Sequence, residues 1–373
     1  MAFDITKNDS QATDIQPVAA KNFDFDTYSE YENNLLKTTG KFFNSQSGVL
    51  VYRRMRAAEV FSYSCRDMKR SLELQLGCLS ESMKFKADIP NFLEPWYGIG
   101  TTASAYGIDY VWGEGLAPAT HARFSTLAEA LQHEPLPISK TEIGRHTLQM
   151  IEYFLEKTGG RLPMCFTDSQ SSFNAATMIV ENTDMLLAML LEPENVMRFF
   201  DILADLSIDF VNEQKRLIGN CLANPGHGFA SARNFSGYGQ SDDNIVMISG
   251  EQYVDIAIPS FQRTGEQFGG PVFHSCGNWS DKISAVKQIC GLRMVDGAFS
   301  VETDPCPNPT TPFAENFANT GIIVNARIVG DLQIIEKTVS ELWKPGMKLI
   351  VVTYCNTPEE QAQAYDLIHE ICK

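Results

Sequence analysis

Apolar and polar positions alternate along most of the chain in a pattern that predicts an α/β fold. From about residue 90 onward, short apolar runs are followed by longer amphipathic stretches, as in strands and helices built around a parallel sheet. Eight such alternations predict a (β/α)8 TIM barrel, with a doubly wound sheet as the alternative. The predicted strands are Asn91–Glu94, Tyr110–Gly113, Leu162–Thr167, Gly228–Ala232, Pro271–Ser275, Gly297–Val301, Gly321–Asn325 and Lys348–Tyr354.

Two of the predicted helices have clear signals. Apolar side chains between Val196 and Phe210 recur at spacings of three and four, which predicts one buried stripe, and Pro193 lies near its start. In the last helix Thr357 can act as the N-cap, Pro358 suits the first helical position, and Glu360 completes a capping box.

The first part of the chain has a different pattern. Residues 1 to about 25 are polar without an apolar period, and the segment from Tyr28 to Lys86 reads as helical. We therefore expect two parts: residues 1–88 as a polar lead-in and N-terminal helical extension, and residues 89–373 as the TIM-barrel catalytic domain.

Composition narrows the classes of function. Hydrophobic residues make up 44% and charged residues 20%, as in ordinary globular proteins. The net charge of −16, without a basic block, disfavours nucleic acid and anionic membranes as partners and favours a small-molecule substrate. There is no signal-peptide pattern, and the nine cysteines are an odd number, so we expect a cytoplasmic protein whose cysteines are free thiols or metal ligands.

The candidate chemistry lies at the ends of predicted strands. His274 and Cys276 are two residues apart in an extended segment, so their side chains should point the same way. Cys355 ends the last predicted strand, and the carboxyl ends of barrel strands open on one face. Two thiolates and one imidazole suit zinc with one exchangeable position. The alternative is a core histidine with small buried thiols.

Glu302 ends another predicted strand and is a candidate fourth ligand that substrate would displace. The alternative is a rim carboxylate that accepts backbone N–H groups. Cys306, between two prolines, is a candidate replacement for one zinc ligand.

The run Phe273-His-Ser-Cys-Gly-Asn, with Cys355 about 80 residues later, resembles the uroporphyrinogen decarboxylase superfamily. The likeness is strongest to its zinc methyltransferase branch, which includes methylcobamide:coenzyme M methyltransferases. It extends over most of the chain from about residue 90. It implies a TIM barrel with zinc on His274, Cys276 and Cys355, and Glu302 resembles the zinc glutamate of cobalamin-independent methionine synthases.

The resemblance implies methyl transfer between a corrinoid and a small substrate, such as a thiol or a methylated O-, N- or S-compound. Zinc makes a bound thiol a nucleophile and polarises a bound ether or amine as a leaving group. The chain has no Asp-x-His-x-x-Gly motif, so we expect a separate corrinoid protein as partner. The direction of transfer and the oligomeric state stay open, with a homodimer among the options.

The sequence leaves three other functions as alternatives. The first is a decarboxylase-like lyase without metal, but an Arg-Gln-Ala-Gly-Arg run is absent where Asn91-Phe-Leu-Glu-Pro-Trp-Tyr stands, so a polycarboxylate has no evident clamp. The second is a non-catalytic partner of a corrinoid protein with structural zinc. The third is an oxidoreductase, suggested by Gly98-Ile-Gly-Thr-Thr-Ala, a motif too short to favour it.

Further polar and aromatic residues are assigned around the metal. Asp242 and Asp243 precede an amphipathic helix and are candidates, with Glu302, for catalytic roles, either by orienting a ligand or by binding substrate. Helix capping is the alternative for the aspartate pair.

The predicted substrate-binding residues lie at three strand ends. Asp168, Gln170 and Asn325 supply polar groups there. Trp96 and Tyr97 are candidates for an aromatic wall, and packing is their alternative role.

Overall fold

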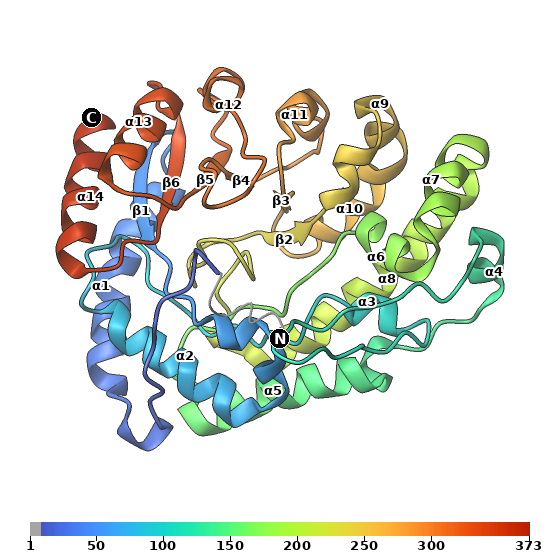
Figure 1. Cartoon of the computed structure of the whole chain (residues 1–373), viewed down its shortest axis with the longest axis horizontal. Coiled ribbons are helices and arrows are strands. Elements are labelled where there is room, and N and C mark those ends of the chain that lie inside the picture. The colour runs from blue at the N-terminus through green and yellow to red at the C-terminus, as the bar shows by residue number, and fades with distance from the viewer. Residues whose placement is uncertain (1–8) are drawn as a thin grey trace.

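The computed structural model describes residues 9–373, and the structural statements below refer to these residues. They form an α/β fold around a parallel sheet of six strands with the order β1-β6-β5-β4-β3-β2 (Figure 1). The strands are β1 Gly48–Arg53, β2 Tyr238–Ser241, β3 Pro271–His274, β4 Met294–Ala298, β5 Ile323–Ile328 and β6 Lys348–Thr353.

The strand order confirms the barrel. Moving from β2 to β6 the order follows the chain without reversal, and β1 then pairs with β6 in parallel from Gly48↔Lys348 to Arg53↔Thr353. A doubly wound sheet reverses its order at a switch point, so that alternative is wrong. In Figure 1, β1 in blue and β6 in orange-red lie side by side although about 300 positions separate them.

The arc between β1 and β2 is less regular. Its extended segments are joined by the single parallel bridges Leu93↔Met164, Met164↔Leu222 and Gln170↔Ser241. Prolines flank these segments, and a proline donates no hydrogen bond to a ladder, which keeps the bridges from extending into longer strands. These prolines are Pro90, Pro95, Pro163 and Pro225.

Helices surround the barrel, with α10 to α14 arranged along one side and α1, α2, α5 and α8 along the other (Figure 1). The longest, α8, carries the predicted apolar stripe, and Pro193 begins it. In α14 the Thr357 hydroxyl accepts the N–H of Glu360, as predicted, while the Glu360 carboxylate accepts from Asn356. The helices are α1 Phe25–Phe43, α2 Met68–Ser82, α3 Thr101–Ser104, α4 Leu127–Gln132, α5 Glu142–Thr158, α6 Ser172–Ile179, α7 Asn182–Leu191, α8 Pro193–Ile218, α9 Gly250–Gln252, α10 Ile258–Glu266, α11 Ile283–Val286, α12 Thr310–Phe317, α13 Leu332–Leu342 and α14 Pro358–Ile371.

The two faces of the strands build two cores. In β6, Ile350 and Val352 pack inside the barrel with residues of other strands. Leu349 and Val351 point outward and pack under the helices. Because successive side chains alternate in a strand, this register decides which polar residues reach the barrel interior.

Several predicted strands need correction. Tyr110–Gly113 is not in the sheet, since Val111 pairs antiparallel with Ala119, and Gly228–Ala232 has only the antiparallel bridge Asn224↔Ala232. The strand predicted at Gly297–Val301 begins and ends three residues earlier, as β4. Strand β2 was not predicted, because its four residues include a glycine and two polar side chains.

The N-terminal prediction is also corrected in part. Helices α1 and α2 lie in the segment read as helical, but Gly48–Arg53 between them is strand β1, with Leu50 to Arg53 buried. The division into residues 1–88 and 89–373 stays a prediction, although the sheet crosses it.

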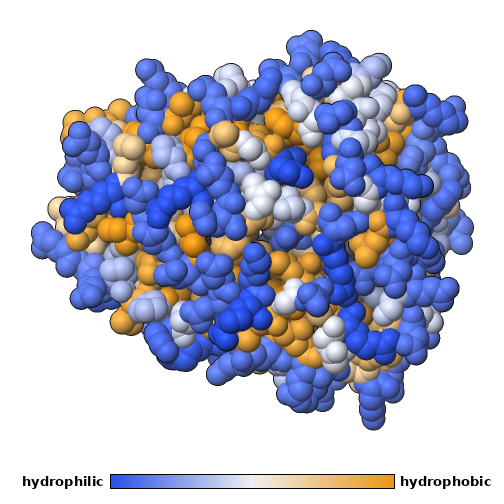
Figure 2. Space-filling model, turned by 180° about the vertical axis from the view of Figure 1, so that it is seen from behind, coloured by the Kyte–Doolittle hydropathy of each residue, from blue (hydrophilic) through white to orange (hydrophobic). Residues whose placement is uncertain are grey.

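In the described part of the chain, we find no helix that combines the length and apolar character needed to cross a bilayer. On the face drawn in Figure 2, groups of hydrophobic residues are interrupted by hydrophilic ones.

Candidate functional site

The structure brings His274 and Cys276 together at the end of β3. His274 shares the inward face of the strand with Val272, and its Nε2 lies 3.3 Å from the Cys276 Sγ. Gly277 follows with a positive φ of 69°, which favours glycine and lets the chain turn away. The spacing of two residues therefore has the geometric consequence expected of an extended segment.

Asp243 is the third member of this group. Its Oδ1 lies 3.7 Å from His274 Nε2 and accepts the backbone N–H of Cys276 at 2.6 Å. One ligand atom from each of the three residues lies within 4.8 Å of the others. Among residues 9–373, this is the group of histidine, cysteine and acidic side chains whose ligand atoms converge closely enough to hold a metal ion.

A buried carboxylate orients His274. Asp296 on β4 accepts from the imidazole Nδ1 at 2.6 Å and from Arg327 Nε on β5 at 2.9 Å. Burial alone would raise the pKa of Asp296, but Arg327 and His274 outweigh it and lower that pKa. Burial likewise acts to lower the pKa of His274, but Cys276 and Asp296 raise it well above its ordinary value.

These residues fit a zinc ion. Imidazole nitrogen, thiolate sulfur and carboxylate oxygen are all ordinary zinc ligands, and three protein donors leave one position for substrate. Asp296 holds Nδ1 and directs Nε2 towards the other two donors, which is the usual support of a ligating histidine.

Cys355 lies outside this group. It lies two residues past the end of β6. Val352 in β6 and Tyr354 just after it pack with the interior core, so alternation places Cys355 on the outer side with the helix-facing core. Its backbone carbonyl accepts from Arg53 Nε at 2.8 Å. Burial raises the pKa of the Cys355 thiol to about 11. Its role as a ligand stays a prediction from the resemblance.

Glu302 and Cys306 are both exposed and lie outside the converging group. Because β4 ends at Ala298, Glu302 lies four residues past the strand, in a turn that lines a different cavity with Phe299 and Lys337. The shifted strand end explains why the predicted ligand position is not reached.

The two predicted catalytic aspartates have different surroundings. Asp242 is fully buried, and its carboxylate accepts from Ser171 Oγ at 2.8 Å and Tyr253 OH at 2.9 Å. Burial raises the pKa of Asp242 to about 7, although both hydrogen bonds act in the opposite direction. Asp243 instead belongs to the metal group, defined as His274, Cys276 and Asp243. Neither side chain caps the following turn of 3-10 helix, so the capping alternative is wrong.

Two of the five predicted substrate residues line the cavity, and the other three are not among its lining residues. Asp168 and Gln170 line the same cavity as His274 and hydrogen bond to each other at 3.0 Å. Trp96 is buried and donates to Asp168 at 3.0 Å. Tyr97 stacks on His146, as a packing residue would, and Asn325 is buried and donates to Asp296 at 2.5 Å.

The central cavity has a volume of about 520 Å³, within the range of small-molecule sites. Two arginines in the cavity wall, Arg54 and Arg56, were not predicted from the sequence; both lie within three residues of the end of β1. Arg54 pairs with Glu94 at 3.3 Å and Arg56 with Asp9 at 2.7 Å. Because each arginine has a carboxylate partner, the cavity offers no free cationic clamp to a polyanion.

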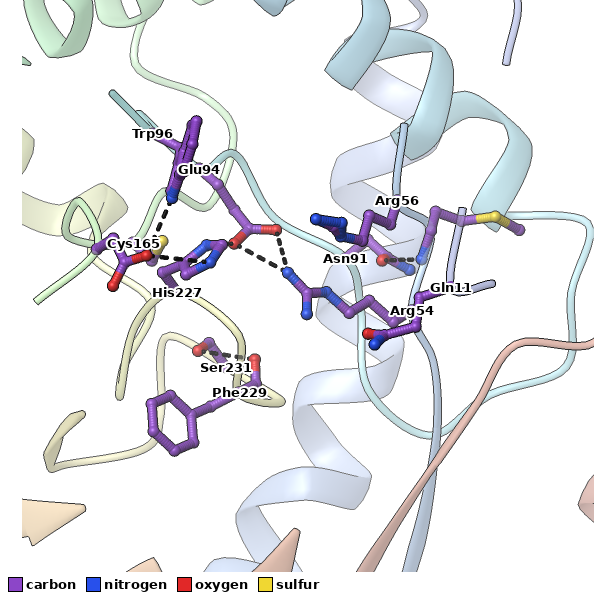
Figure 3. Close-up of polar contacts among 12 residues, drawn as sticks. Gln11, Arg54, Arg56, Asn91, Glu94, Trp96, Cys165, His227, Phe229 and Ser231 are labelled. Carbon is purple, nitrogen blue, oxygen red and sulfur yellow. Dashed lines mark hydrogen bonds and ion pairs between the residues drawn. The ribbon is translucent and has the colours of Figure 1, made fainter. Parts of the chain in front are cut away.

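A second histidine, also missed, lines this cavity. His227 Nδ1 lies 2.6 Å from Glu94 Oε2, and His227 Nε2 lies 3.5 Å from Asp168 Oδ2 (Figure 3). Burial alone would raise the pKa of Glu94, but Arg54 and His227 outweigh it and lower it to about 2. No local motif indicates this contact, because 133 positions separate His227 from Glu94.

The chain is similar to known proteins in sequence and in fold. Residues 47–223 match the family described as Uroporphyrinogen decarboxylase (URO-D). The match starts one residue before β1, which agrees with β1 as the first barrel strand.

Among solved structures, a methyltransferase from Methanosarcina mazei is 13% identical, with a TM-score of 0.59, covering 99% of this chain and 98% of that chain. At this identity the likeness shows a shared fold. The carboxyl transferase domain of Rhizobium etli pyruvate carboxylase with oxalate is 9% identical with a TM-score of 0.36, covering 99% of this chain and 56% of that chain. No curated protein matches the sequence significantly.

Proposed function

We propose that the chain is a zinc-dependent methyltransferase that moves a methyl group between a corrinoid, carried by a separate protein, and a small substrate. The substrate is a thiol or a methylated O-, N- or S-compound. The observation that carries this proposal is the convergence of His274, Cys276 and Asp243 in a cavity of small-molecule size. The M. mazei protein, a methyltransferase by description, supports the reaction class.

The chain's own side chains prepare this site. His274 and Cys276 would hold the ion, with Asp243 as the third donor that the geometry supports. When bound, zinc would lower the pKa of a substrate thiol or polarise a leaving group. Asp296 fixes the orientation of His274, and Arg327 keeps Asp296 ionised.

Cys355 is the competing third donor, favoured by the resemblance. It would have to turn from the outer face of the barrel into the interior, breaking the hydrogen bond between its carbonyl and Arg53. The two hypotheses differ in the variant that should lose zinc. It is Asp243→Asn if Asp243 is the third donor and Cys355→Ser if Cys355 is.

Zinc content tests both the site and its third ligand. We expect elemental analysis to find about one zinc per chain in the wild-type protein and almost none in Cys276→Ser. Comparison of Asp243→Asn with Cys355→Ser identifies the third ligand as the residue whose loss releases zinc. A wild-type protein without zinc after purification under reducing conditions would overturn the proposal.

A lyase without metal is the second candidate, favoured by the match of residues 47–223 to the family described as Uroporphyrinogen decarboxylase (URO-D). It predicts turnover that chelators leave unchanged. The methyltransferase predicts that a chelator abolishes turnover and that zinc restores it.

A further inference from the structure

The cavity contains a second histidine held like the first. The first array, called the His274 array, consists of His274, Asp296 and Arg327. The His274 Nδ1 lies 2.6 Å from the Asp296 carboxylate, which pairs with Arg327 Nε at 2.9 Å. In the His227 array, defined as His227, Glu94 and Arg54, the imidazole Nδ1 meets a carboxylate at 2.6 Å and the carboxylate meets the guanidinium at 3.3 Å (Figure 3). Among residues 9–373, the second array is not part of a converging group of metal ligands.

The contacts of His227 define its tautomer. Glu94 is a carboxylate, which can only accept, so the proton of the neutral imidazole lies on Nδ1 and the lone pair on Nε2. Nε2 makes no hydrogen bond within residues 9–373 and faces the Asp168 carboxylate at 3.5 Å. The Asp168 oxygens already accept from Trp96 and Gln170, both at 3.0 Å.

The ring of His227 is also fixed in the wall of the cavity that His274 and Cys276 line. Phe61 and Trp96 pack beside it, with ring centroids 5.2 and 6.3 Å away. The same loop carries Phe229, whose ring centroid lies 6.2 Å from that of His274. Both histidines line the same cavity of about 520 Å³.

We infer that His227 is the proton acceptor for a thiol substrate that binds beside His274 and Cys276, an inference that rests on the proposed function. The S–H bond breaks, its electron pair stays on sulfur, and the proton moves to His227 Nε2. The imidazolium then lies between the carboxylates of Glu94 and Asp168. The other charges of this surrounding are Arg54 and Arg56, which are paired with Glu94 and Asp9.

Nitrogen NMR on metal-free protein tests the tautomer without any turnover. In wild-type protein labelled with ¹⁵N-histidine, the signals absent from His227→Gln belong to His227, and we expect them to show the proton on Nδ1. Glu94→Gln should shift the population towards the Nε2–H form, because the amide lacks the negative charge that holds the proton. A proton found on Nε2 in the neutral wild-type imidazole would overturn the inference.

Calorimetry tests the proton transfer. Zinc-loaded protein is titrated with 2-mercaptoethanol at pH 7.5 in two buffers of different ionisation enthalpy, which gives the number of protons released. We expect the wild type to release almost none, because His227 keeps the proton, and His227→Gln to release about one, the proton of a single thiol. The S-methyl analogue, 2-(methylthio)ethanol, has no thiol proton and should release none from either protein.

The matched control is His369→Gln. His369 also pairs with a carboxylate, Asp88, at 2.9 Å, but it does not line the central cavity. This variant should release as few protons as the wild type. Equal release from wild type and His227→Gln would overturn this inference alone, whereas wild-type protein that binds neither zinc nor thiol would overturn the proposed function as well.

Discussion

Two histidines line one cavity and are held by the same chemistry, yet they suit different tasks. The His274 array and the His227 array each place a carboxylate 2.6 Å from Nδ1 and an arginine behind that carboxylate. They differ in what surrounds Nε2. His274 Nε2 lies near the Cys276 thiol and the Asp243 carboxylate, whereas His227 Nε2 faces the Asp168 carboxylate at 3.5 Å. The support behind a histidine therefore fixes its orientation, while its neighbours at the free nitrogen decide between metal binding and proton transfer.

The largest effect should come from breaking the ion pair of the His227 array. Glu94→Gln leaves Arg54 charged and buried without its partner, which should cost about 3–5 kcal/mol of unfolding free energy at pH 7. Urea unfolding followed by circular dichroism measures it. A loss below about 1 kcal/mol, the size of an exposed pair, would contradict the burial of this array.

The same variant predicts a pH dependence. The pKa of Glu94 falls from 4.5 to about 2 on folding, so its stabilising contribution is complete above about pH 4.5 and is lost as the pH falls towards 2. The difference in unfolding free energy between wild type and Glu94→Gln should therefore narrow over this interval. An unchanged difference between pH 7 and pH 3 would argue against the lowered pKa.

The two predicted thiol ligands should differ in reactivity in the metal-free protein. Cys276 is exposed, whereas Cys355 is buried with its pKa raised to about 11. We expect Cys355 to react with iodoacetamide at least about 100-fold more slowly, since the thiolate is the reactive form. Peptide mass spectrometry over time measures both rates, and comparable rates would indicate that the end of β6 opens readily.

A smaller effect is expected behind the metal group. Asp296→Asn keeps an acceptor for His274 but removes the charge, which should weaken zinc binding by about 10- to 100-fold in a chelator competition. Asp88→Asn, beside His369, is the control and should bind zinc like the wild type. If both variants bind zinc equally well, His274 is not a ligand oriented by Asp296.

The smallest effect concerns Glu302. Because this side chain is exposed in a turn beyond β4, Glu302→Gln should change zinc affinity by less than about twofold, as surface substitutions usually do. A clear loss of affinity would instead support the ligand role that the resemblance predicted.

The barrel was predictable because most of its strands are apolar runs followed by amphipathic helices. β3 and β6 were found at their places, and β5 was found with its end displaced. β1 was missed because Arg53 at its end and Arg54 just after it are residues typical of a helix surface. In the structure Arg53 is buried and donates a hydrogen bond to the Cys355 carbonyl. The segments joined by single bridges are too short for an alternating pattern of apolar and polar residues to be recognised.

The metal group was predictable only where its members are close in sequence. His274 and Cys276 follow from strand alternation, and the same rule, applied to Val352 and Tyr354, places Cys355 on the opposite face. Asp296 and His227 could not be found from spacing. Asp296 meets His274 through the register of the neighbouring strands β3 and β4, and His227 meets Glu94 across 133 positions of the chain.

The pairing of β1 with β6 has a consequence for synthesis. Gly48 leaves the ribosome about 300 residues before its partner Lys348, so one edge of β1 has no partner while most of the chain is made. An unpaired strand edge invites association with other chains, and a nascent chain would need protection over this interval. A circular permutant that starts after β1 and places this strand behind β6 would bring the two together at once, and it should refold faster and aggregate less than the natural order.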